Sequence, residues 1–215
     1  MYRLLAALIL AFSGLFPPLA YAQLSGSPGA VVSTEQVRAE LLAHAPDGAG
    51  PGRTVWVGLQ LTHQPHWHTY WKNSGDSGLP TELQWTLPPG VRAGDIAWPT
   101  PRKFPLGTLA NYGYDGTVLL PVPLTIEPGF AGTQVDVKLY AAWLACRQEC
   151  IPEEGHFTLR IPVQGATALN GMAFEAALAA APTRQPASGS TLAPEADWLN
   201  VSLVGLPAAW RGQPL

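Results

Sequence analysis

The sequence predicts an all-β protein, an antiparallel β-sandwich or barrel followed by one short helix. Charged residues make up only 13% of the chain, against about 25% in an average protein, which argues against long surface helices. The 22 Gly and 22 Pro break the chain into runs of strand length. Two runs, 135–140 and 157–163, alternate apolar and polar residues with the period of a half-buried strand. Several short strands at this spacing are typical of a sandwich or barrel.

Composition also excludes several function classes. The formal net charge of −3 leaves no basic footprint for nucleic acid. Eight Trp and an apolar content of 47% argue against disorder. The sequence contains no Ser-His-Asp hydrolase pattern, nucleotide-binding loop or zinc quartet.

Residues 1–22 have the order of a secretory signal peptide. Arg3 supplies a positive charge, an apolar run follows from Leu4 to Phe16, and Ala20-Tyr-Ala22 is a small-x-small cleavage site. The apolar run is shorter than the about 20 residues that a membrane span needs. We therefore expect a mature chain from Gln23 that works outside the cytosol.

The elements after the signal peptide are predicted in three parts. Residues 23–165 form the β domain, with strand-length runs at 55–61, 82–87, 118–126, 135–145 and 156–163. Residues 166–195 contain an Ala-rich helix over 170–181, with Met172, Phe174 and Leu178 available for a core, and then a linker rich in Pro and Ser. Residues 196–215 read as the start of a further, truncated β domain, since the strand that begins at Trp198 has no predicted partner.

Cys146 and Cys150 are the only two cysteines, and their spacing restricts their geometry. Residues four apart on one straight strand lie about 13 Å from each other, too far for a disulfide. The pair therefore requires a helix turn or a tight hairpin. Strand patterns before and after it favour a hairpin, with the turn within 146–155, and an oxidising compartment would favour a disulfide there.

Two interpretations of this pair follow from the residues alone. As a structural staple, so short a loop adds only about 2 kcal/mol to stability. As a redox pair at a hairpin tip, the sulfurs are accessible to another thiolate, which exchange requires. Arg147 would favour a thiolate at Cys146, while Glu149 would oppose one at Cys150. The spacing leaves both interpretations open.

A third interpretation is a copper site. The pattern C-x3-C with Pro two residues later resembles the site of Sco-type copper chaperones, where two thiolates and a histidine bind copper. The candidate ligands here are Cys146, Cys150, His66, His68 and His156, because thiolate and imidazole suit copper(I). His66 and His68 would share one face of a strand.

Four stretches together resemble the periplasmic N-terminal domain of the DsbD family of thiol:disulfide interchange proteins, especially its ScsB-type branch. These stretches are 67–81, 96–101, 111–116 and 142–154, and the resemblance spans roughly 30–165. It implies an immunoglobulin-like β-sandwich in which Cys146 and Cys150 cycle between dithiol and disulfide without any other cofactor. The spacing here is closer than in the DsbD proteins most familiar for this chemistry.

The resemblance also implies partners and a place in the cell. The chain would be a protein-disulfide reductase domain of a larger protein that is tethered to the inner membrane. Electrons would come from a membrane-embedded domain through a thioredoxin-like domain, and would leave to periplasmic acceptor proteins. ScsB-type relatives are associated with copper tolerance. Within the pair, we expect Cys150 to be attacked and Cys146 to resolve.

Family members cover the cysteine pair with a loop that carries a Phe. The region that corresponds to this loop, 106–114, contains no Phe in this sequence. Tyr112 or Tyr114 is therefore the expected cap.

Overall fold

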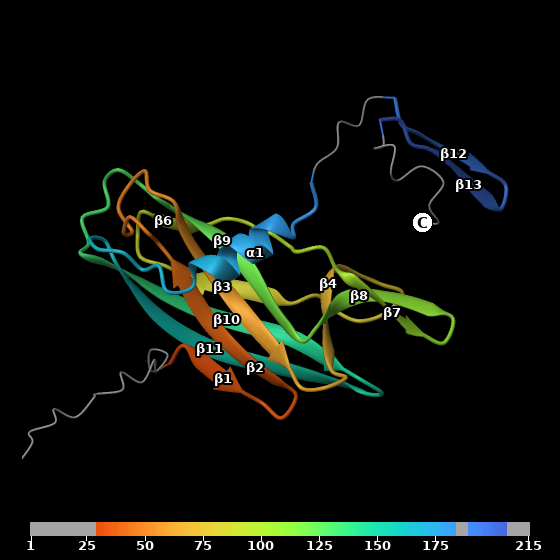
Figure 1. Ribbon diagram of the computed structural model, residues 1–215, viewed down its shortest axis with the longest axis horizontal. Helices are drawn as coiled ribbons and strands as arrows, with labels where there is room; N and C mark the ends of the chain where they lie inside the picture. Colours follow the sequence, from red (N-terminus) through yellow and green to blue (C-terminus); the bar gives the residue numbers. More distant parts are fainter. Residues whose placement is uncertain (1–28, 184–188, 206–215) are drawn as a thin grey trace, which may run out of the picture.

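Two antiparallel sheets pack face to face in the computed structural model, which describes residues 29–183 and 189–205 (Figure 1). The first sheet contains, in spatial order, β1 (Val31–Ser33), β2 (Val37–His44), β3 (Val55–His63), β9 (Thr117–Ile126) and β6 (Val91–Ala93). The second contains β11 (Cys150–Pro162), β10 (Gln134–Cys146), β4 (His68–Gly75), β8 (Leu109–Asp115) and β7 (Arg102–Leu106). A further strand, β5 (Glu82–Thr86), also pairs with β10. The predicted antiparallel sandwich is confirmed.

The core lies between the two sheets, and the period-two pattern of the strands produces it. In β3, the side chains of Val55, Val57, Leu59 and Leu61 point inward and are at most 1% exposed. The residues between them are Trp56, Gly58, Gln60 and Thr62, and they lie on the other face. Each inward aliphatic side chain removes apolar surface from water, which contributes about 1.5–3 kcal/mol.

The same alternation decides where the cysteines lie. In β10 the side chains at every second position from Val135 to Ala145 point into the core and are at most 3% exposed. Cys146 follows Ala145 and therefore belongs to the outer face, together with Ala142 and Leu144. The sequence thus places the first cysteine at the end of a core strand and outside the main core.

One helix, α1 (Gly171–Ala179), covers the outer face of the first sheet (Figure 1). Phe174 and Ala177 lie on its buried side and pack against Leu42 and Leu119. The prediction that Met172 contributes to a core is wrong, because Met172 is 85% exposed. Successive helix residues turn by about 100°, so Met172 faces away from the side that carries Phe174.

The contrast between these two helix residues gives a test of stability. Phe174 is 1% exposed, and we expect Phe174→Ala to lower the free energy of unfolding by about 3–5 kcal/mol. Met172→Ala is the matched control, with an expected change within about 0.5 kcal/mol. Urea denaturation measures both. Equal losses would show that α1 does not pack through Phe174.

The C-terminal region differs from its predicted organisation. The strand expected from Trp198 is present as β13 (Trp198–Ser202). It pairs with β12 (Thr191–Glu195), a strand that lies within the predicted linker. The expected signal peptide, 1–22, lies outside the described residues. In the ranges that the structure describes, no helix has the length and apolar character to cross a membrane.

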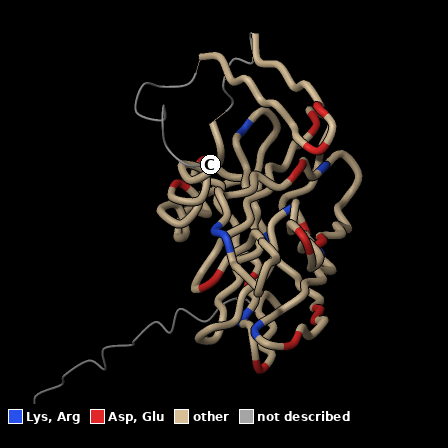
Figure 2. The backbone as a smooth tube through the Cα atoms, turned by 90° about the vertical axis from the view of Figure 1, so that its right-hand side faces the viewer, with Lys and Arg blue, Asp and Glu red and all other residues tan. Residues whose placement is uncertain are grey.

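Charged residues are distributed sparsely over the molecule. In the view of Figure 2, Lys and Arg positions are scattered along the chain and do not gather into one patch. The four ion pairs among the described residues are all on the surface, for example between Arg102 and Asp115. Exposed pairs of this kind contribute about 0–1 kcal/mol each, so the fold depends on its core.

Candidate active site

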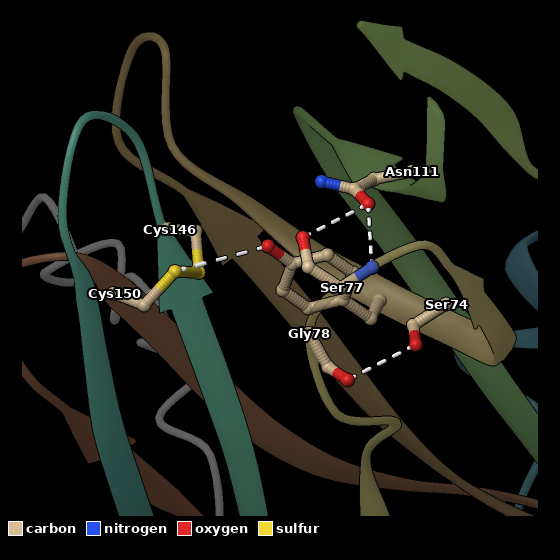
Figure 3. The surroundings of a disulfide bond; sticks show 7 residues. Ser74, Ser77, Gly78, Asn111, Cys146 and Cys150 are labelled. Carbon is tan, nitrogen blue, oxygen red and sulfur yellow. Dashed lines mark hydrogen bonds between the residues drawn. A yellow bond between two sulfur atoms is a disulfide. The ribbon is translucent and has the colours of Figure 1, made fainter. Parts of the chain in front are cut away.

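The two cysteines form a disulfide at the tip of the β10–β11 hairpin (Figure 3). Cys146 and Cys150 lie directly opposite each other in the register, with their Cα atoms 4.1 Å apart. The turn is closed by a hydrogen bond of 2.9 Å that the backbone N–H of Arg147 donates to the carbonyl of Glu149. The predicted hairpin is present, but its turn contains only residues 147–149, because β11 already begins at Cys150.

The two cysteine residues differ in their exposure to solvent. Cys146 is 2% exposed, whereas Cys150 is an exposed residue. Cys146 points outward from the sheet, and the 75–79 loop and the β7–β8 hairpin supply residues around it, including Ser77, Phe104 and Leu106. Of the two cysteines, Cys150 is therefore the more exposed to an incoming thiolate.

Tyr70 of β4 contacts the exposed sulfur. Its hydroxyl lies 3.8 Å from Cys150 Sγ, and since a disulfide sulfur carries no hydrogen, the hydroxyl donates. Tyr70 is 3% exposed, and burial raises the pKa of its hydroxyl, so that it keeps its proton. The site therefore includes a hydrogen-bond donor aimed at the sulfur of the exposed cysteine.

His68 forms the floor of the same site. It lies opposite Cys146 where β4 meets β10, stacks on Phe104 with ring centroids 4.5 Å apart, and meets Tyr70 edge to face. Burial lowers the pKa of His68, and nearby Asp115 only partly opposes this. The imidazole is thus neutral at pH 7 and acts as an aromatic packing surface.

The β7–β8 hairpin is joined to the 75–79 loop by hydrogen bonds (Figure 3). Asn111 is 2% exposed, and its Oδ1 accepts hydrogen bonds of 3.0 Å from both the backbone N–H and the hydroxyl of Ser77. The Asp76 carboxylate accepts a further bond from the backbone N–H of Ala110. These bonds fix the two segments as one cover beside the disulfide.

The expected caps lie elsewhere. Tyr114 is buried, its hydroxyl donates a 2.7 Å hydrogen bond to the carbonyl of Pro99, and burial raises the pKa of that hydroxyl far above its usual range. Tyr112 is half-buried, and neither tyrosine lines the cavity at the disulfide. Phe104 does line it, and it lies two residues before the 106–114 region.

Of the two charged residues in the turn, Arg147 lines the cavity, with its guanidinium 5.1 Å from the centre of the Trp67 ring. A cation–π contact of this kind contributes about 0.5–1 kcal/mol at an exposed site. Glu149 is exposed at the turn and does not line the cavity.

The three histidines of the copper interpretation are not brought together. His66 and His68 line the cavity of about 250 Å³ that also contains both cysteines. His156 lies opposite Tyr140, six register positions from the cysteine pair, or about 20 Å along the strand. Within 29–183 and 189–205, no three His, Cys, Asp or Glu side chains are grouped so that they could hold a metal ion.

The stacking of Phe104 on His68 makes a testable contribution to the protection of the disulfide. An aromatic pair contributes about 1 kcal/mol, so Phe104→Ala should open the cover more often and speed reduction by dithiothreitol about fivefold. Leu109→Ala at the tip of the same hairpin is the control, since Leu109 does not line the cavity. Stopped-flow measurement of reduction compares them, and identical rates in the two variants would contradict this role of Phe104.

Two comparisons with known proteins gave matches that include the β domain. Residues 38–162 match the sequence model described as the N-terminal part of the thiol:disulfide interchange protein DsbD. The crystal structure of the N-terminal periplasmic domain of ScsB from Proteus mirabilis superposes with a TM-score of 0.60 at 21% sequence identity. This match covers 81% of the chain and 68% of the ScsB chain, and it confirms the predicted immunoglobulin-like fold. Comparison with curated proteins gives no significant match.

Proposed function

This chain belongs to the family of DsbD N-terminal domains, and on that premise we propose that it relays reducing equivalents to partner proteins through Cys146 and Cys150. One observation carries the proposal: an exposed Cys150 is bonded to a buried Cys146 at a hairpin tip. A staple needs no such asymmetry. An exchange pair requires one sulfur to meet partners and a second that is protected until it resolves the mixed disulfide.

The relay begins from the dithiol. The thiolate of Cys150 attacks one sulfur of a partner disulfide, and the other partner sulfur leaves as a thiolate and takes up a proton. The Cys146 thiolate then attacks the Cys150 sulfur of the mixed disulfide and releases the second partner sulfur. The partner gains two electrons and two protons, and the Cys146–Cys150 disulfide forms.

Two neighbours support this chemistry at Cys150. The Tyr70 hydroxyl, 3.8 Å from Sγ, can donate to a thiolate as well as to the disulfide sulfur. The Arg147 guanidinium adds positive charge to the cavity, which favours thiolate over thiol. The described residues place no helix N-terminus at the sulfurs, so Cys150 would be a modest nucleophile whose rate depends on docking.

A thioredoxin-like dithiol protein or domain would return the pair to the reduced state. In a full-length protein it would receive electrons from a membrane-embedded domain, and periplasmic disulfide proteins would be the acceptors. Three observations support the periplasm as the location: the signal-peptide pattern in 1–22, the disulfide itself, and the fold shared with a periplasmic domain.

A redox titration tests the proposal. The mature protein is equilibrated in glutathione or dithiothreitol buffers, and its free thiols are alkylated and counted by mass. We expect a midpoint between about −180 and −270 mV, as in proteins that exchange disulfides. A midpoint below about −300 mV would identify a structural disulfide and overturn the relay.

A second candidate function is copper(I) binding by the reduced pair. His66 and His68 line the same cavity as both sulfurs, although in the disulfide form of the described structure these side chains are not grouped as metal ligands. Thiolate and imidazole are suitable ligands for this ion. Titration of the reduced protein with copper(I) against a chromophoric chelator separates this candidate from the relay. Tight binding that His68→Gln weakens would support it, and binding no stronger than that of the oxidised protein would eliminate it.

A further inference from the structure

A second hollow lies beside the disulfide on the same face of the β10–β11 hairpin. This groove of about 320 Å³, called the acidic groove below, is lined by Leu79, Glu82, Ala142, Leu144, Pro152 and Glu154, among others. Ala142 and Leu144 precede Cys146 by four and two positions, and Pro152 and Glu154 follow Cys150 by two and four. Even spacings keep side chains on one face of a strand, so the groove continues directly from the disulfide.

Carboxylates surround the apolar floor of this groove. Ala142 of β10 lies opposite Glu82 of β5 on one side and Glu154 of β11 on the other. Its small side chain therefore lies between two exposed acidic residues. Glu154 accepts a 2.6 Å hydrogen bond from the Tyr140 hydroxyl. Among the described residues, no Lys or Arg forms an ion pair with either carboxylate.

A third carboxylate is independently unusual. Glu153 lines the same groove and is only 8% exposed. Its Oε2 accepts a 2.6 Å hydrogen bond from the indole N–H of Trp143, but its buried Oε1 has no hydrogen-bond partner in the described structure. Glu153 is the register partner of Trp143, whose side chain points into the core, so this oxygen lies on the inner face of β11 and the carboxylates open to a ligand are Glu82 and Glu154.

We propose that the acidic groove binds a Lys or Arg side chain of the exchange partner, in an extended segment four residues from the partner's reactive cysteine. The inference rests on the proposed relay. The aliphatic stem of such a side chain would lie on Leu79, Ala142 and Leu144, and its cationic end would meet the carboxylates. The spacing follows from the strand, since four residues span about 13 Å between Ala142 and Cys146. The groove thereby selects partners by charge at a fixed distance from the sulfur.

Peptide substrates test this selection. Two peptides carry a central Cys as a mixed disulfide with thionitrobenzoate, and either Lys or Glu four positions to each side of it. Attack by the reduced protein releases coloured thionitrobenzoate. We expect the Lys peptide to react about tenfold faster than the Glu peptide at low salt, and this preference to shrink at 1 M salt.

Paired variants assign the preference to the groove. The double variant Glu82→Gln/Glu154→Gln should lose most of the Lys preference. The control, Glu35→Gln/Glu175→Gln, removes the same charge from two exposed residues outside the groove and should keep it. A groove variant with the wild-type ratio of rates would overturn the proposal.

Two further measurements separate this inference from the relay itself. Bis(2-hydroxyethyl) disulfide has no charge, so it should oxidise all these reduced proteins at one rate; no reaction with it or with either peptide would contradict the relay. Peptides with Ser in place of Cys report binding alone. A shift of the Trp143 indole NMR signal with the Lys peptide and not with the Glu peptide would support the groove, and no difference between the peptides would overturn it.

Discussion

Replacing Cys150 by Ser is expected to reduce thiol–disulfide exchange to the background rate, whereas Cys146→Ser is expected to leave a stable mixed disulfide with the partner. The reason is the difference in access, since Cys150 is exposed and Cys146 is 2% exposed. Without Cys150 the remaining thiol is covered and cannot reach a partner. Without Cys146 the attack proceeds, but no second thiolate is present to release the partner.

Non-reducing gel electrophoresis and intact mass measure this result after each reduced variant is mixed with a disulfide-bearing thioredoxin-like protein. The two variants are matched controls for stability, because both lose the same disulfide and the same contribution of about 2 kcal/mol from loop closure. A mixed disulfide formed by Cys150→Ser and not by Cys146→Ser would reverse the two roles. Full exchange by both variants would eliminate the relay.

Much of the fold could be predicted from the sequence, because the core strands keep a strict period of two. The β3 and β10 patterns are visible as alternating letters, and they lead to the structure's inner faces. The segments β4, β7 and β8 were not predicted as strands. They are rich in Gly, Pro and polar residues, and they form strands because neighbours supply their hydrogen bonds.

The site was predictable only where it is local in the sequence. Cys146 and Cys150 are four residues apart, so their spacing and the flanking strands were enough to place them at a hairpin. Phe104 and Tyr70 reach the disulfide from distant segments, and their positions depend on the pairing of β4 with β8 and of β7 with β8. Phe104 lies in β7, the first strand of the β7–β8 hairpin, so the 106–114 region of the sequence does not contain it.

The acidic groove shows the same limit. Glu82 and Glu154 are 72 positions apart, and they face each other only because β5 and β11 pair with opposite sides of β10 at Ala142. Read along the chain, each is an ordinary surface carboxylate. Function that depends on sheet register becomes visible only once the register is known.

Gly78→Ala is expected to lower the free energy of unfolding by about 3 kcal/mol and to displace Tyr70 from the disulfide. Gly78 has a φ of +92°, which L side chains adopt at a cost of about 1–2 kcal/mol. A Cβ there would also lie 2.3 Å from the Tyr70 ring, far inside van der Waals contact, and relieving such overpacking costs a further 1–3 kcal/mol or so. The ring would have to move, and with it the hydroxyl that lies 3.8 Å from Cys150 Sγ.

Gly107→Ala separates the two costs. Gly107 also has a positive φ, +62°, but a Cβ there would meet no atom within 4 Å. Its substitution should therefore cost only the backbone term of about 1 kcal/mol and leave exchange unchanged. Urea denaturation gives the free energies of unfolding of the two variants. The rate at which the reduced protein attacks a small mixed disulfide reports the loss of the Tyr70 donor, and Tyr70→Phe shows how large that loss is when the hydroxyl is absent. Equal results for Gly78→Ala and Gly107→Ala in both measurements would show that the close packing of the 75–79 loop on Tyr70 does not contribute to the site. The thiolate at Cys150 would then have to be stabilised by Arg147 without the Tyr70 hydroxyl.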